Sequence, residues 1–222
     1  MALSAEEEET IDSIKRWWRE TGRLLFAGIA AIAVVYAGWQ FFQGSQSRTV
    51  QQASALYDQL TQLVVVAPEQ EVSEDERQQA RQIVESLKTD HDSSVYALYG
   101  ALFGARLAVE EGNLTLARQE LEWLLDNTRS GLFSETEPTL VRLAQLRLAE
   151  VMLASGDTGS ALTLISSADQ GSLQAEFEEL RGDIYMAQGQ RDQALAAYET
   201  AMLAGDGSPV LQMKVTELQG SR

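Results

Sequence analysis

Three stretches of the chain repeat one short pattern, in which a glycine is followed five residues later by an alanine. The pairs are Gly112 with Ala117, Gly156 with Ala161, and Gly189 with Ala194. Glycine suits the turn that ends a helix, because it adopts left-handed backbone conformations without a steric penalty. Alanine at a fixed distance after the turn lets the next helix pack closely against the first. The pattern therefore predicts a row of helical hairpins.

The last of these units resembles a tetratricopeptide repeat, a helix-turn-helix unit of about 34 residues. The matching positions are Gly182, Tyr185, Gly189, Ala194, Tyr198 and Ala201. In this last unit, Glu178 and Asp206 stand where the repeat usually has tryptophan and proline. Equivalent units begin at Ala149 and at Ala105. We therefore expect an all-α fold, a tetratricopeptide-like α-solenoid of helical hairpins.

The segments around the repeats carry helix-boundary signals. Ser73 and Glu76 form a potential capping box that opens residues 74–88, which we expect to make an irregular first helix pair with residues 50–66. Thr136 and Pro138 suit a helix start after an enlarged loop. Residues 208–219 are predicted to form a short amphipathic helix that covers the last repeat, as the end of a stack requires.

A long apolar segment precedes this domain. Residues 24–47 contain no charged side chain, and a helix over residues 24–42 would extend ~28 Å, close to the hydrocarbon thickness of a bilayer. Aromatic residues stand at both ends, where the membrane interfaces would fall. These are Trp17, Trp18, Trp39, Phe41 and Phe42. The segment therefore predicts a single transmembrane helix.

The basic residues around this segment predict the orientation of the helix in the membrane. Lys15, Arg16, Arg19 and Arg23 precede it, whereas only Arg48 follows closely. Because basic residues near a span stay on the cytoplasmic side, we expect three parts. These are a cytoplasmic N-terminal tail (1–23), a transmembrane signal anchor (24–47) and a periplasmic tetratricopeptide-like domain (48–222).

Two other interpretations of the apolar segment stay open. A cleaved signal peptide could use Val35 and Ala37 as its small-residue site, but the long apolar run and the acidic residues 6–9 are unlike such a leader. A buried soluble helix would not need interfacial aromatics at both flanks. One face of the segment carries Ala27, Ala30, Ala33 and Ala37. This stripe is a candidate contact with another transmembrane helix, or only the alanine content common in membrane helices.

Composition excludes several classes of function. The formal charge of -16 argues against nucleic acid as a partner, because phosphate binding needs basic stripes. The chain has no cysteine, and its one histidine, His91, stands in a polar loop where we expect it to be solvent-exposed. No phosphate loop, dinucleotide fingerprint, nucleophile elbow or metalloprotease motif occurs. We therefore predict no enzyme activity, no catalytic residues, no cofactor and no metal.

The repeat register identifies a candidate partner-binding surface, because the first helices of such hairpins line a concave face. The residues expected there are Tyr99, Leu102, Arg106, Leu143, Leu146, Glu150, Glu176, Glu179 and Asp183. They are apolar toward the N-terminal repeats and acidic toward the C-terminal one, which suits an extended or helical segment with hydrophobic and basic residues. Alternatively, the leucines and Tyr99 belong to the core between repeats, and the acids form a solvated face.

Three segments in this order carry a resemblance to a known family. They are IDSIKRWWRETGR before the apolar run, AGWQFF at its end, and SSVYALYGALFGARLAVEEG in the first repeat. Together they resemble the YfgM family, ancillary subunits of the bacterial SecYEG translocon. The acidic segment EQEVSEDERQQ departs from this pattern.

The resemblance implies a single-pass protein of the bacterial inner membrane, with a cytoplasmic N-terminus and a periplasmic domain. The implied partners are the SecYEG translocon and the membrane-anchored periplasmic chaperone PpiD, with unfolded exported polypeptides as a further class. The implied role is that of a non-catalytic, chaperone-like adaptor for newly exported proteins. A scaffold for another envelope assembly, such as cell division or outer-membrane biogenesis, is the alternative.

Overall fold

The computed structural model describes residues 49–63, 72–129, 136–205 and 207–220. The chain divides into two compact units, Met1–Gln52 and Ala53–Arg222. Only residues 49–52 of the first unit are described, and they are helical. The predicted tail, the predicted anchor and its alanine stripe all lie outside the described residues. Among the helices that are described, none combines the length and the apolar character needed to cross a bilayer.

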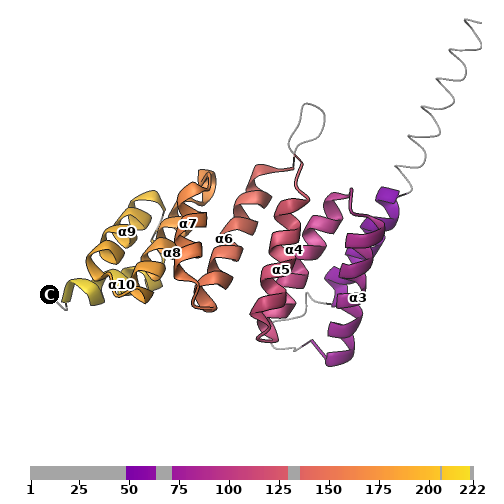
Figure 1. Ribbon diagram of the computed structural model, residues 1–222, viewed down its shortest axis with the longest axis horizontal. Helices are drawn as coiled ribbons and strands as arrows, with labels where there is room; N and C mark the ends of the chain where they lie inside the picture. The colour runs from indigo at the N-terminus through magenta and orange to yellow at the C-terminus, as the bar shows by residue number, and fades with distance from the viewer. Residues whose placement is uncertain (1–48, 64–71, 130–135, 206, 221–222) are drawn as a thin grey trace, which may run out of the picture. The chain divides into compact units, whose positions relative to one another are not determined.

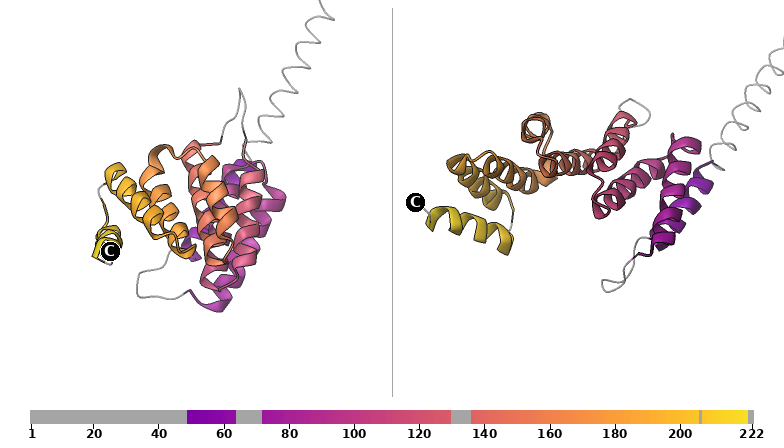
Figure 2. Two further views of the ribbon diagram at one scale, coloured as in Figure 1. Left: turned by 60° about the vertical axis from the view of Figure 1, so that its left-hand side comes forward. Right: turned by 60° about the horizontal axis from the view of Figure 1, so that its bottom comes forward.

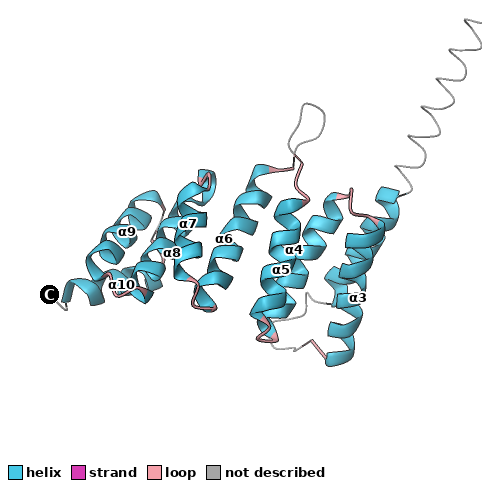
Figure 3. Ribbon diagram, in the orientation of Figure 1, coloured by secondary structure: helices cyan, strands magenta, loops and turns pink. Residues whose placement is uncertain are grey.

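The second unit is built from helices, with no strand in its described residues (Figure 3). A helical stretch over residues 53–63 comes first. The elements that follow are α3 (Glu74–Asp90), α4 (Val95–Glu110), α5 (Leu114–Asp126), α6 (Pro138–Ala154), α7 (Thr158–Ser167), the 3-10 turn η2 (Gly171–Leu173), α8 (Gln174–Ala187), α9 (Arg191–Ala204) and α10 (Pro209–Gly220). Each helix from α3 to α10 packs against the next one along the chain (Figures 1 and 2). Helices α4–α5, α6–α7 and α8–α9 form the three predicted hairpins.

One turn geometry closes all three hairpins. The glycines of the sequence pattern have φ of +74° at Gly112, +84° at Gly156 and +74° at Gly189. In each turn the residue after the glycine donates its backbone N–H to a carbonyl five positions earlier, as Asn113 does to Ala108 at 2.8 Å. This is the Schellman arrangement, which uses a left-handed residue to satisfy the last carbonyls of a helix. The alanines that follow are fully buried, as the pattern predicts.

Two helix starts test the boundary signals. The capping box that opens α3 is confirmed, because Ser73 Oγ accepts from the Glu76 N–H and Glu76 Oε2 accepts from the Ser73 N–H. Helix α6 begins at Pro138 as predicted, but Thr136 is not its cap. The Glu137 carboxylate accepts from the first backbone N–H groups instead, and the Thr136 hydroxyl accepts from the Arg129 N–H. A carboxylate suits this position because the helix dipole favours negative charge there.

The hydrophobic core runs through the whole unit. Its central part joins the small residues of the repeat pattern to large side chains such as Leu121, Ile165 and Phe177, all of which are at most 1% exposed. At the C-terminal end, α10 buries Leu211, Val215 and Leu218 beside Ala194 and Tyr198 of α9. This confirms the predicted capping helix, which covers the apolar side of the last repeat.

Candidate partner-binding site

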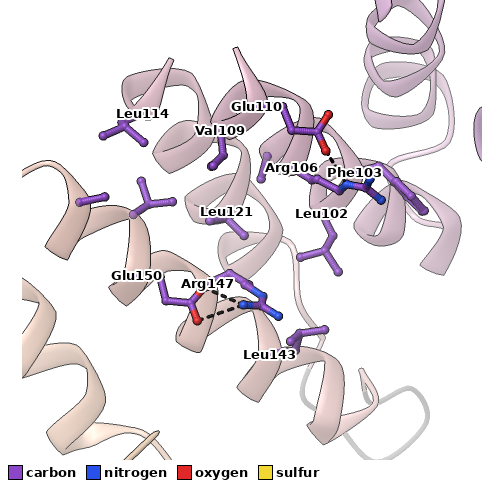
Figure 4. Close-up of a pocket in the computed structure, with 13 residues that line it drawn as sticks. Leu102, Phe103, Arg106, Val109, Glu110, Leu114, Leu121, Leu143, Arg147 and Glu150 are labelled. Atoms are coloured by element: carbon purple, nitrogen blue, oxygen red, sulfur yellow. Dashed lines mark hydrogen bonds and ion pairs between the residues drawn. The ribbon is translucent and has the colours of Figure 1, made fainter. Parts of the chain in front are cut away.

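An apolar groove lies between the first helices of two successive hairpins, α4 and α6, with α5 contributing to its wall (Figure 4). Its volume is about 630 Å³. We call it the apolar groove, and it is lined by Leu102, Phe103, Ala105, Arg106, Val109, Glu110, Leu114, Leu121, Leu143, Arg147, Glu150, Val151 and Ala154. Leu102 of α4 and Leu143 of α6 lie on opposite walls in Figure 4, with Leu121 of α5 between the two helices.

The charged residues of the apolar groove pair with each other. Arg106 Nε lies 2.7 Å from Glu110 Oε1 on α4, and Arg147 Nη1 lies 2.8 Å from Glu150 Oε2 on α6 (Figure 4). Both pairs join residues one helical turn apart and are half exposed, so each contributes little to stability. Their consequence is that the groove carries no net charge.

A second groove of about 560 Å³ adjoins the first, between α6 and α8. We call it the acidic groove, and it is lined by Leu146, Arg147, Glu150, Leu153, Ala154, Glu176, Glu179, Leu180 and Asp183. Four carboxylates therefore face one guanidinium. The two grooves share Arg147, Glu150 and Ala154 on α6, which makes them neighbouring parts of one surface.

Part of this acidic charge already holds a cation from the capping helix. Lys214 Nζ of α10 lies 2.6 Å from Asp183 Oδ1 and 2.9 Å from Glu179 Oε1, and 5.3 Å from the centre of the Tyr198 ring. Burial lowers the pKa of Lys214, but the hydrogen bonds that its ammonium group donates to both carboxylates outweigh this and raise it. Burial, together with the hydrogen bond that the Tyr198 hydroxyl donates to Asp183, raises the pKa of Tyr198.

A family profile described as a tetratricopeptide repeat-like domain matches residues 15–220. The chain belongs to this family. The match covers nearly all of the sequence and includes the whole segment predicted as an anchor, so the family's domain reaches beyond the hairpins.

Relatives named "Ancillary SecYEG translocon subunit" align over almost their whole length. The protein of Haemophilus influenzae is 29% identical over 92% of this chain and 93% of its own. That of Neisseria gonorrhoeae is 26% identical over 99% and 100%, and that of Escherichia coli K12 is 24% identical over 98% and 99%. These matches confirm the resemblance to the YfgM family. A tetratricopeptide-like subunit is a non-catalytic adaptor type, and the prediction that the chain is not an enzyme is confirmed on that ground. No solved structure matches significantly.

The structure brings nearly all of the sequence-predicted contacts to the two grooves. Leu102, Arg106 and Leu143 line the apolar groove, Leu146, Glu176, Glu179 and Asp183 line the acidic groove, and Glu150 lines both. Tyr99 lies outside both grooves. Its ring centre is 5.8 Å from that of Tyr57, within an aromatic group that includes Tyr96 and Phe103.

The predicted role of Leu146 needs correction. This side chain is only 4% exposed and belongs to the central core, because it points from α6 toward its neighbours in the stack. The alternative expectation, that some of these leucines form the core between repeats, is right for this residue. Leu146 forms the floor of the acidic groove and offers little surface to a partner.

Several groove residues were missed by the repeat register. They include Phe103, Val109, Leu114, Arg147 and Val151. Helical spacing could have found part of this set, because Val109 follows Leu102 by two turns and Arg147 follows Leu143 by one. Leu114 could not be found this way, since it comes from the second helix of the hairpin.

The prediction that His91 is solvent-exposed is wrong. The residue is only 8% exposed, and it stands directly after α3 as the C-cap of this helix. The polar residues beside His91 in the sequence therefore do not indicate how exposed this residue is in the folded protein. Within the described residues, no three His, Asp or Glu side chains are placed so that they could hold a metal ion.

Proposed function

We propose that the chain is a single-pass inner-membrane adaptor that associates with the SecYEG translocon and presents its hairpin domain in the periplasm. One observation carries this proposal. The relatives named as ancillary SecYEG translocon subunits align from end to end, through the basic tail and the apolar segment as well as the hairpins. A shared repeat domain alone would leave the membrane segment unmatched.

The role that we propose is to hold a binding surface beside the point where exported chains emerge. A tether raises the effective concentration of a weak binding surface, so that modest affinity is enough. The apolar groove and the acidic groove supply such a surface on the first helices. The partners in this proposal are the translocon, the membrane-anchored chaperone PpiD and unfolded exported polypeptides.

The membrane segment has its own part in the proposal. We assign residues 24–47 as a signal anchor that remains in the mature protein, with residues 1–23 in the cytoplasm and residues 48–222 in the periplasm. The four basic residues before the segment support this direction. Ala27, Ala30, Ala33 and Ala37 would let a transmembrane partner approach closely.

Photocrosslinking in native membranes tests the proposal. A photoreactive residue at Ala33 reports contacts of the anchor, and one at Arg147 reports contacts of both grooves, because this side chain is exposed and lines each of them. We expect translocon subunits from Ala33, and PpiD or exported chains from Arg147. Recovery of components of cell division or outer-membrane assembly without the translocon would contradict the proposal.

A further inference from the structure

The two grooves differ in chemistry and share one wall, so a single ligand that crosses α6 meets both. The apolar groove offers Leu102, Val109 and Leu143 to such a ligand, and its own charges are already paired. The acidic groove offers carboxylates in excess. A ligand that matches both must be apolar over one part and cationic over the adjoining part.

The structure itself contains an example of what two carboxylates of the acidic groove bind. The ammonium group of Lys214 sits against Asp183 and Glu179 and above the Tyr198 ring. Glu176 lies on the same groove, is exposed, and makes no ion pair with any described residue. A basic side chain from outside therefore finds a carboxylate there without displacing Lys214.

The walls of the grooves also restrict the backbone of the ligand. They are helices, whose backbone N–H and C=O groups are bonded within each helix, so they offer no edge with which an extended chain could pair. A ligand that buried an extended backbone against the apolar side chains would leave its own polar groups unpaired. A helix satisfies these groups internally and presents only side chains.

From these observations we infer that the two grooves together bind an amphipathic helix of a partner protein. Its apolar side chains, spaced three and four residues apart, enter the apolar groove, and a Lys or Arg further along the same helix lies at Glu176 in the acidic groove. This inference rests on the proposed function, because it names the chemistry of the segment that the adaptor would recognise.

The test uses the full chain in nanodiscs of zwitterionic lipid, with empty nanodiscs as the control for binding to lipid. Three fluorescent peptides serve as probes. The first is an amphipathic helix with leucines on one face and lysine at one end, the second replaces lysine with glutamate, and the third rearranges the same residues into alternating, strand-like order. Fluorescence anisotropy measures the Kd of each.

We expect the lysine peptide to bind at least about tenfold more tightly than the strand-like peptide and several-fold more tightly than the glutamate peptide. Equal binding of the lysine and glutamate peptides would overturn the role of the acidic groove. Preference for the strand-like peptide would overturn the helical ligand. Absence of binding by all three would overturn the inference as a whole.

Matched variants locate the binding. Val109→Asp and Leu143→Asp place a charge in the apolar groove, and neither residue belongs to a buried core cluster. Val95→Asp is the control, since Val95 is on the same helix and is 46% exposed against 45% for Val109. We expect the two groove variants to weaken binding about tenfold or more and the control to leave it unchanged.

A second pair tests the charge. Glu176→Gln should remove most of the preference for lysine over glutamate, whereas Glu199→Gln, on the exposed side of α9, should retain it. Equal effects of the two variants would contradict the inference. The proposed function is judged separately, because translocon crosslinks from Ala33 do not depend on the grooves. Crosslinks without peptide binding would overturn only the inference, and peptide binding without crosslinks only the proposed function.

Discussion

Two lysines form similar contacts toward opposite ends of the hairpin stack, but the two sites differ in their exposure to solvent. Lys88 of α3 lies 2.8 Å from Glu120 Oε1 and 5.3 Å from the centre of the Trp123 ring. Lys214 of α10 likewise combines carboxylate contacts with an aromatic ring at 5.3 Å. The first pair is buried, with side chains 13% and 10% exposed. The side chains of Lys214, Glu179 and Asp183 are 28%, 30% and 34% exposed, and the two carboxylates line the acidic groove.

This difference determines what each lysine can contribute. A buried ion pair is costly to break, because removal of one partner leaves the other as a poorly solvated charge. A partly exposed pair exchanges its partners for water at lower cost. Lys88 therefore belongs to a buried pair, whereas Lys214 belongs to a cluster that water reaches.

The largest effect is expected at the buried pair. Lys88→Met leaves the Glu120 carboxylate buried without its cation, and we expect a loss of about 3–5 kcal/mol in the free energy of unfolding. Urea unfolding of the full chain in mild detergent, followed by far-UV circular dichroism, measures it. The double variant Lys88→Met, Glu120→Gln should recover part of the loss. A loss below about 1 kcal/mol for the single variant would place this pair among surface pairs.

The glycines beside the two sites should respond differently to an added methyl group. A Cβ at Gly182 would overlap the ring of Tyr198, so Gly182→Ala should cost about 1–3 kcal/mol through overpacking. A Cβ at Gly104 would lie 3.1 Å from Val84 Cγ1 and 3.3 Å from the carboxylate of Glu120, the partner of Lys88. These are tight contacts that the gain in helix propensity can largely offset.

Thermal unfolding shows which of the two glycine variants is less stable. Gly159→Ala, on α7 with open space around its Cβ, serves as the control and should be neutral or slightly stabilising. A Gly104→Ala variant less stable than Gly182→Ala would show that the Tyr198 ring moves aside more easily than the Lys88 site.

A smaller effect is expected at Lys214. Lys214→Met should lower the free energy of unfolding by about 1 kcal/mol, because these ion pairs are partly exposed to water, which screens them. The comparison with Lys88→Met under identical conditions is the measurement. Equal losses of unfolding free energy in Lys88→Met and Lys214→Met would contradict the distinction between a buried and a partly exposed lysine.

Alkaline pH should destabilise the C-terminal site. The pKa values of Tyr198 and Lys214 are both raised above their usual 10.0 and 10.5. Groups with raised pKa contribute stability that is complete below the unfolded value and is lost as pH rises through the folded one. Stability should therefore fall above about pH 10, and less steeply in Lys214→Met. Identical slopes for the two proteins would refute this assignment.

The sequence predicts the hairpins well because their signals are local. Gly112, Gly156 and Gly189 have the left-handed backbone that their turns need, and the alanines after them are buried as expected. The cap of α6 was misassigned between two adjacent polar residues, since Thr136 and Glu137 can both accept hydrogen bonds. Only the path of the backbone decides between them.

The site was less predictable because it depends on contacts between distant segments. The register placed Leu143 and Glu150 correctly on the first helix, but the depth of Leu146 depends on how closely α6 and α8 approach. Lys214 meets Asp183 and Glu179 from 31 and 35 residues away, a pairing that no helical spacing indicates. The burial of His91 is likewise not indicated by the polar residues beside it in the sequence.

Hydrogen–deuterium exchange most directly tests whether the groove surface binds the partner. The full chain in nanodiscs is compared with and without the purified SecYEG translocon carrying its associated chaperone. We expect slower exchange in α4, α6 and α8, the first helices of the hairpins, and in the part of α5 that lines the apolar groove. Protection confined to α7 and α9, or no change in any hairpin, would contradict the account.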